Sequence, residues 1–219
     1  MRLPIAIVGV ASLLSYAGCS PISPRATNDS ELTARLPDTD DSDLLAFRPH
    51  ARQLEIGDEV PDFELRDPTG ASLNLSELRG RVIVMTFFTA ADDPEGGREP
   101  LARLGEVANA LGPRLIDRVV LMPVLIADSG DADARLSNAS ASVPQDGPQW
   151  LFVRAGPEPT ALLATAFGVV MWKDADGNIG HTFNTVVIDP RGRFFDRFPG
   201  LDSWSPIDVV AATNLAANR

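Results

Sequence analysis

Few side chains in this chain of 219 residues could act together as the ligands of one metal site. His181 is one of two histidines, and Asp92, Asp93 and Glu95 lie close together after an apolar run at 82–88. Imidazole with carboxylates suits Cu(II) or Zn(II). If that run is a central strand, its loop and the segment around His181 should meet at the carboxyl edge of a sheet. The alternative is a hydrogen-bonded surface histidine beside a solvated acidic loop.

Sulfur chemistry is restricted by the presence of a single cysteine, Cys19, which lies near the amino terminus. Disulfide exchange requires a thiolate and a partner sulfur, so the rest of the chain cannot perform it. Cu(I) prefers soft Cys and Met ligands. Beyond the first residue the methionines are Met85, Met122 and Met171, and the first two lie in predicted core strands, where Met usually packs.

Cys19 closes an apolar stretch, residues 3–16, that follows the positive Arg2. This arrangement predicts a signal peptide over residues 1–18. Ala17-Gly18-Cys19 resembles the bacterial lipobox, although Tyr16 departs from it. The resemblance implies a diacylglycerol group on Cys19 and a lipoprotein that faces the periplasm from the outer or inner membrane. Ordinary cleavage, which would leave a free thiol, is the alternative. The stretch is too short to span a bilayer, which needs about 20 apolar residues.

Composition predicts a tether followed by one domain. Residues 19–53 are rich in Ser, Pro, Thr and Asp and lack apolar periodicity, so we expect an acidic flexible tether. Residues 54–219 are then expected to form the folded domain. The net charge of −11 excludes a nucleic-acid partner, because such binding requires clustered Lys and Arg. An acidic surface also repels anionic lipid head groups, so the acyl chain is expected to be the membrane anchor.

Periodicity predicts an α/β domain with a mixed sheet flanked by helices. The domain begins with extended segments on either side of a turn at 67–70. The predicted strands are 82–88, 119–126, 150–153, 185–188 and 193–198. The predicted helices are 101–111, 160–167 and a last helix after Ser205, with Ile207, Val210, Ala211 and Leu215 as its apolar face. The polar stretch 128–149 carries no predicted element.

Four motifs then carry a resemblance to a known family. The segment 57–65 (GDEVPDFEL) and the segment 75–82 (LSELRGRV) are similar to the opening of redoxin and Sco/SenC domains. AFGV at 166–169 precedes His181, which stands eight residues before Asp189 in VIDPRGR. That order resembles Sco/SenC proteins. The resemblance implies a thioredoxin-like fold with an N-terminal β-hairpin extension.

The family binds copper through two cysteines and this histidine, commonly for delivery to cytochrome oxidase. Matching the motif puts Ala91 and Glu95 at the cysteine positions, and neither side chain replaces a thiolate. We therefore expect a degenerate, redox-inactive site and no catalytic residues. The resemblance implies a metal-binding or delivery protein that uses His181. A non-catalytic interaction module in envelope or respiratory-complex assembly is the alternative, and an enzyme with a new site is the third possibility.

Overall fold

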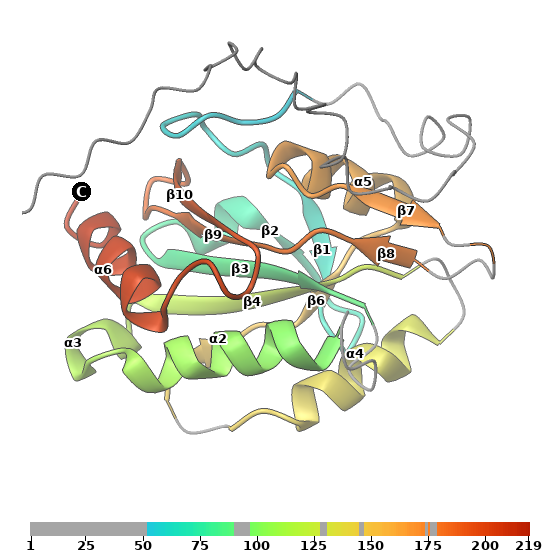
Figure 1. Cartoon of the computed structure of the whole chain (residues 1–219), viewed down its shortest axis with the longest axis horizontal. Coiled ribbons are helices and arrows are strands. Elements are labelled where there is room, and N and C mark those ends of the chain that lie inside the picture. Colours follow the sequence, from blue (N-terminus) through green and yellow to red (C-terminus); the bar gives the residue numbers. More distant parts are fainter. Residues whose placement is uncertain (1–51, 90–96, 128–130, 145–146, 174, 176–178) are drawn as a thin grey trace, which may run out of the picture. The chain divides into compact units, whose positions relative to one another are not determined.

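The computed structural model describes residues 52–89, 97–127, 131–144, 147–173, 175 and 179–219 (Figure 1). The strands are β1 (Glu64–Arg66), β2 (Ser72–Asn74), β3 (Val82–Phe88), β4 (Val119–Leu125), β5 (Gln149–Trp150), β6 (Val153–Arg154), β7 (Met171–Lys173), β8 (Ile179–His181), β9 (Asn184–Ile188) and β10 (Phe194–Pro199). The helices are η1 (Leu75–Leu78), α2 (Glu99–Ala110), α3 (Pro113–Ile116), α4 (Ala132–Ala141), α5 (Pro157–Ala166) and α6 (Pro206–Ala216).

The main sheet is mixed and runs in the order β10-β9-β3-β4-β6-β1-β2, with β5 also paired to β4. β3 and β4 are parallel, and β9 is antiparallel to β3. At the far edge β1 and β2 form an antiparallel hairpin that joins the sheet through β6. β7 and β8 form a separate two-stranded ribbon. This is the predicted α/β architecture, including the N-terminal hairpin.

Helices cover both faces of the sheet, which explains why β3 is apolar throughout. All seven residues of β3 are buried. Ile83, Met85 and Phe87 belong to the cluster beneath α5, whereas Val82 and Val84 belong to the cluster beneath α2 and α6. Successive strand residues point to opposite faces, so a strand covered on both sides carries no polar alternation. Figure 1 shows α5 and α2 on opposite sides of the sheet.

Several parts of the secondary structure differ from the sequence prediction, and η1, α3, β7 and β8 lie where it named no element. The polar stretch 128–149 contains α4, whose Leu136 and Ala139 are buried and whose other residues are polar or alanine. The single predicted strand 150–153 is two short strands, β5 and β6, which pair with different parts of β4. The sequence signals for these elements were weak, because α4 has only two buried residues and β5 and β6 have two residues each.

The predicted apolar face of α6 is largely wrong, since only Val210 of its four residues packs against the core, where it is partly buried. Ile207 is 63% exposed and Leu215 is 65% exposed, whereas the buried face consists of Val209, Ala212, Thr213, Ala216 and Ala217. Both sets of residues recur at helical spacing, because the helix is apolar nearly all round. The small alanines allow α6 to pack closely beside β9 and β10, which leaves the larger Ile207 and Leu215 outside.

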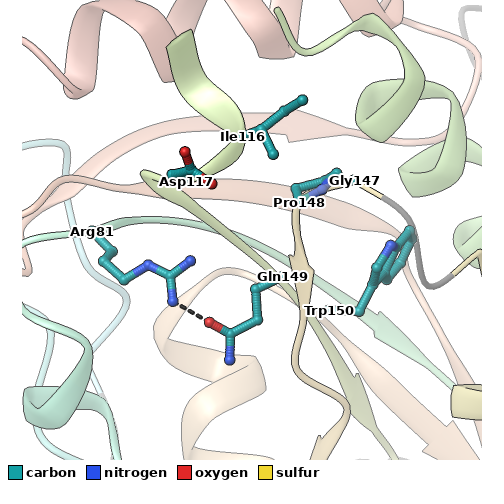
Figure 2. Close-up of a pocket in the computed structure, with 7 residues that line it drawn as sticks. All are labelled: Arg81, Ile116, Asp117, Gly147, Pro148, Gln149 and Trp150. Carbon is teal, nitrogen blue, oxygen red and sulfur yellow. Dashed lines mark hydrogen bonds between the residues drawn. The ribbon is translucent and has the colours of Figure 1, made fainter. Parts of the chain in front are cut away.

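A polar pocket lies at the amino ends of β3 and β4 (Figure 2). Arg81 donates one hydrogen bond to the Gln149 side chain and another of 3.0 Å to the Val119 carbonyl oxygen. These bonds tie the start of β3 to β4 and β5. The pocket is therefore at the end of the sheet opposite to the end that β9 enters from His181.

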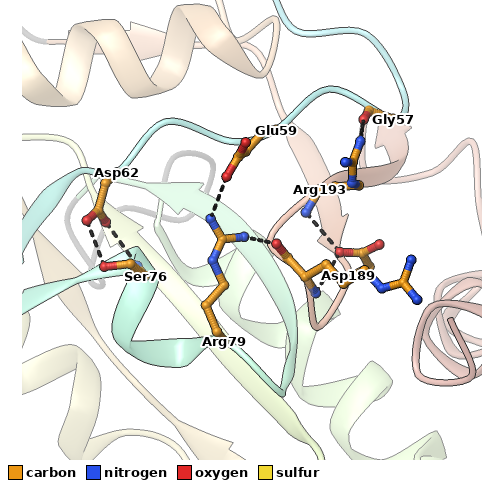
Figure 3. Close-up of polar contacts among 8 residues, drawn as sticks. Gly57, Glu59, Asp62, Ser76, Arg79, Asp189 and Arg193 are labelled. Atoms are coloured by element: carbon orange, nitrogen blue, oxygen red, sulfur yellow. Dashed lines mark hydrogen bonds and ion pairs between the residues drawn. The ribbon is translucent and has the colours of Figure 1, made fainter.

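The turn between β9 and β10 is held by a set of contacts that we call the clasp (Figure 3). The Asp189 carboxylate accepts hydrogen bonds of 2.9 Å from the backbone amides of Arg191 and Arg193. Arg79 donates to the Arg191 carbonyl oxygen and lies 3.2 Å from the Glu59 carboxylate. Gly192 has a φ of 75°, a left-handed conformation that favours glycine.

The clasp joins three segments that are distant in sequence. The Val60 amide donates to the Gly192 carbonyl oxygen at 3.0 Å, and the Gly80 amide donates to the Pro190 carbonyl oxygen at 2.8 Å. Close by, the Ser76 hydroxyl donates to Asp62 at 2.7 Å and its amide donates at 2.9 Å, which lowers the pKa of that carboxyl below its ordinary value. The motifs at 57–65, 75–82 and 187–193 thus build one structural junction.

Among the described residues, no helix combines the length and the hydrophobicity that crossing a bilayer requires.

Candidate functional site

The candidate site lies at the sheet edge where β3 ends and β9 begins. The register pairs Thr86 with Thr185, so the chain leaving β3 through Thr89 and the chain entering β9 from His181 reach the same edge. The loop at 90–96 lies outside the described residues, so its meeting with the segment around His181 stays a prediction. β4 runs parallel to β3 and ends at this edge as well. Loops at the carboxyl ends of neighbouring strands of an open α/β sheet commonly form binding sites.

His181 is positioned by the ribbon of β7 and β8. The register pairs Met171 with His181 and Trp172 with Gly180. The Trp172 ring lies directly over Gly180, where a β-carbon would come within 2.4 Å of the ring. Because side chains alternate along a strand, Met171 and His181 share the other face of the ribbon. A glycine at position 180 therefore allows the tryptophan to cover one face while the histidine occupies the other.

The His181 ring is buried, with 4% of the residue exposed. Its Nδ1 lies 3.0 Å from the Thr182 carbonyl oxygen, which can only accept a hydrogen bond. In the neutral ring Nδ1 therefore carries the proton, and Nε2 carries the lone pair that binds metals. The Phe183 ring meets the imidazole edge-on at a centroid distance of 5.0 Å. The surface position that we considered as an alternative for His181 is wrong.

The end of α5 anchors the segment that holds His181. Asn184 is buried and donates a 2.9 Å hydrogen bond from Nδ2 to the Phe167 carbonyl oxygen. Gly168 then turns the chain with a φ of 72°, and the Val169 amide returns to the Ala164 carbonyl oxygen at 2.8 Å. The segment at 166–169 thus directs the chain from α5 into β7 and fixes the start of β9.

The other predicted site residues lie outside the described residues. They are Asp92, Asp93 and Glu95 as metal ligands, Ala91 and Glu95 as the positions that match the family cysteines, and Cys19 as the lipid attachment point. Within the described ranges, no group of three or more His, Cys, Asp or Glu side chains is placed to hold a metal ion. His181 is therefore the one predicted ligand that the structure positions.

Met171 lies opposite His181 on the ribbon, a position that the sequence did not predict. It is 8% exposed and belongs to the cluster beneath α5, so it packs as methionine usually does. Predicting a hairpin across the polar residues 174–178 would have placed residues 171 and 181 opposite each other.

The comparisons with solved structures bear on the fold. No protein-family model and no curated protein matches the chain. A SCO1/SenC family lipoprotein from Bacillus anthracis superposes with a TM-score of 0.64 and 16% identity, covering 73% of this chain and 95% of that one. ScoI from Bradyrhizobium japonicum with copper bound gives 0.58 and 23%, covering 74% and 99%. BsSco, a member of the Sco family of cytochrome c oxidase assembly proteins, gives 0.62 and 16%, covering 76% and 98%.

The fold thus defines the chain first as a thioredoxin-like α/β domain. More narrowly, its arrangement is that of the Sco/SenC structures, and the predicted resemblance is confirmed at the level of the fold. Cys19, the single cysteine of the sequence, stands far before β3, so no thiol pair follows that strand. The chain combines a Sco-type fold and a positioned histidine with a strand-end segment that lacks cysteine.

Proposed function

We propose that this chain is an exported, lipid-anchored protein that binds a copper or zinc ion through His181 and takes part in metal handling during assembly of a respiratory or envelope complex. It acts without thiol chemistry and without catalysing a reaction. The observation that supports this proposal best is the hydrogen bond from Nδ1 of His181 to the Thr182 carbonyl oxygen. Histidines that bind metals generally donate their second ring N–H in this way.

The similar structures supply the biological setting of the proposal. One of them is a lipoprotein, one holds copper, and one belongs to a family of cytochrome c oxidase assembly proteins. A bound ion would act as a Lewis acid or would be delivered to another protein. His181 contributes one neutral nitrogen donor in a defined orientation, while the acidic residues Asp92, Asp93 and Glu95 are proposed to add carboxylate oxygens that suit Cu(II) or Zn(II).

The His181→Ala substitution tests this function in the full chain carrying Cys19→Ser, which removes the only thiol. We expect the affinity for Cu(II) and Zn(II), measured by competition titration with a chromogenic chelator, to fall about 100-fold because the oriented nitrogen is lost. His50→Ala is the matched control, since it removes the only other histidine. Unchanged affinity in the His181 variant, or no binding by the parent chain at micromolar metal, contradicts the proposal.

The exposed side of α6 favours a second candidate, a protein-interaction module. Ile207 and Leu215 are large apolar side chains that lie more than 60% exposed, and Ala211 lies exposed between them at helical spacing. Asp202 and Asp208 are exposed near Ile207. Apolar residues gathered on a surface commonly mark protein contacts. The fitting occupant is a partner surface that is apolar and bordered by basic side chains.

The double substitution Ile207→Gln and Leu215→Gln separates this candidate from metal binding. We expect it to abolish chemical crosslinking to purified cytochrome c oxidase subunits while the free energy of unfolding changes by less than about 0.5 kcal/mol, as at most surface positions. Ile56→Gln serves as the control because Ile56 is exposed to a similar degree, 66%, elsewhere in the chain. Crosslinking that survives the double substitution excludes α6 as the contact surface.

A further inference from the structure

We propose that Met171 is a second ligand to the ion bound by His181, and that the two side chains form a site selective for Cu(I). The inference rests on the proposed function, because it gives the His181 site a second donor and a preferred oxidation state. It differs from a site built on carboxylates, since it uses a thioether and an imidazole from the β7–β8 ribbon. Both residues are described by the structure, and both are buried.

The register of the ribbon brings the two side chains together. The backbone amide of Thr182 donates to the Val170 carbonyl oxygen at 2.9 Å. Hydrogen-bonded and non-hydrogen-bonded pairs alternate along antiparallel strands, so the adjacent pair, Met171 and His181, is a non-hydrogen-bonded pair. Opposing side chains lie closest in such pairs, with β-carbons about 4.5–5.5 Å apart. A thioether and an imidazole on one face at this separation are within reach of a common ion.

The orientation of the imidazole suits this role. Because Nδ1 faces the Thr182 carbonyl oxygen, Nε2 carries the lone pair in the neutral ring. Nε2 is also the nitrogen farther from the backbone, and it is buried, as Met171 is. The flexible, unbranched Met171 side chain can then adjust its sulfur to the ion without a change in the backbone.

The surroundings of the pair favour a soft, singly charged ion. Met171 packs in the cluster that includes Phe167 and Val169, and Ile179 packs against that cluster. Burial of charge in apolar surroundings is costly, and the cost rises with the charge of the ion. Thioether sulfur selects Cu(I), whereas Zn(II) and Cu(II) prefer nitrogen and oxygen donors. A buried His–Met pair therefore favours Cu(I) over either divalent ion.

Nuclear magnetic resonance of the full chain with Cys19→Ser and carbon-13 methionine methyl groups tests the ligand directly. The methyl signals of Met85, Met122 and Met171 are assigned by single substitutions to Leu. Anaerobic addition of Cu(I) should shift the Met171 methyl and the His181 ring signals, while the Met85 and Met122 methyls, which lie in buried strands, stay in place. Zn(II) should leave the Met171 methyl in place.

Affinity measurements on Met171→Leu provide the second readout. Leu is close to Met in volume, so packing is largely retained. We expect the Cu(I) affinity to fall about tenfold or more and the Zn(II) affinity to stay unchanged. Met122→Leu, which alters a buried methionine in β4, is the matched control and should change neither affinity.

The outcomes distinguish this inference from the function on which it rests. A shift of the His181 signals without a shift of the Met171 methyl overturns the role of Met171 and leaves metal binding by His181 intact. The absence of any response from either residue overturns both. If Met171→Leu fails to fold, the methyl signal of the parent chain still decides the question.

Discussion

Replacement of Gly192 by alanine is expected to lower the free energy of unfolding by about 2–4 kcal/mol. The left-handed φ of 75° costs a residue with a β-carbon about 1–2 kcal/mol. A β-carbon at this position would also overlap the Arg79 guanidinium and displace it from the Arg191 carbonyl oxygen. The remaining loss comes from that charge-assisted hydrogen bond, reduced because Arg79 is partly exposed. Urea unfolding followed by circular dichroism measures the change.

Gly105→Ala is the control for the clasp. Gly105 lies inside α2, and a β-carbon there meets nothing within 4 Å. Alanine at an unobstructed helical position should raise the free energy of unfolding by about 0.5–1 kcal/mol. Both substitutions replace glycine by alanine. Changes of opposite sign in the free energy of unfolding would therefore isolate the effect of the turn at Gly192. A Gly192→Ala protein as stable as the parent would show that the clasp contributes little to the stability of the fold.

Cys19→Ser is expected to abolish attachment of the chain to the membrane. Each buried methylene of an acyl chain contributes about 0.8 kcal/mol, and stable anchoring needs a second membrane signal beyond one chain. The net charge of −11 gives no attraction to anionic lipids, so the diacylglycerol group on Cys19 is expected to supply both chains. Cell fractionation and metabolic labelling with a radioactive fatty acid, in a bacterial host, measure the loss.

Ser20→Ala is the matched control for lipid attachment, because it alters the neighbouring hydroxyl and keeps the thiol. We expect this variant to retain its label and to remain with the membranes. A Cys19→Ser protein that still carries fatty acid, or that still sediments with membranes, contradicts the proposed anchor. After such a result, the role of the stretch 3–16 would have to be determined by testing whether the stretch is cleaved from the chain.

The fold was largely predictable because its central strands carry strong local signals. β3 and β4 are long apolar runs, and the turn at 189–192 is marked by proline, arginine and glycine at fixed places. α6 shows the limit of such reasoning. Its start after Ser205 was predicted, but a helix that is apolar nearly all round does not reveal which face meets the sheet. The size of the alanines, rather than hydrophobicity, decides that orientation.

The site was less predictable than the fold, because it depends on pairing between segments. The eight-residue spacing between His181 and Asp189 located the histidine, and its burial followed only from the tertiary structure. The neighbour of His181 on the ribbon depends on a register that a short strand of three residues does not specify from sequence. The structure does not describe Asp92, Asp93 and Glu95, so their part in the site stays a prediction.

The clasp and His181 stand at opposite ends of the same two strands, β3 and β9. Substitutions after the carboxyl end of β3 are therefore expected to leave the contacts that stabilise the clasp in place, so that the chemistry there can change without loss of the fold. Of the four sequence motifs that resemble Sco/SenC proteins, three lie in the clasp. A resemblance based on these motifs is therefore evidence for a shared fold. Whether two such proteins share an activity has to be judged from the residues at the other end of the strands.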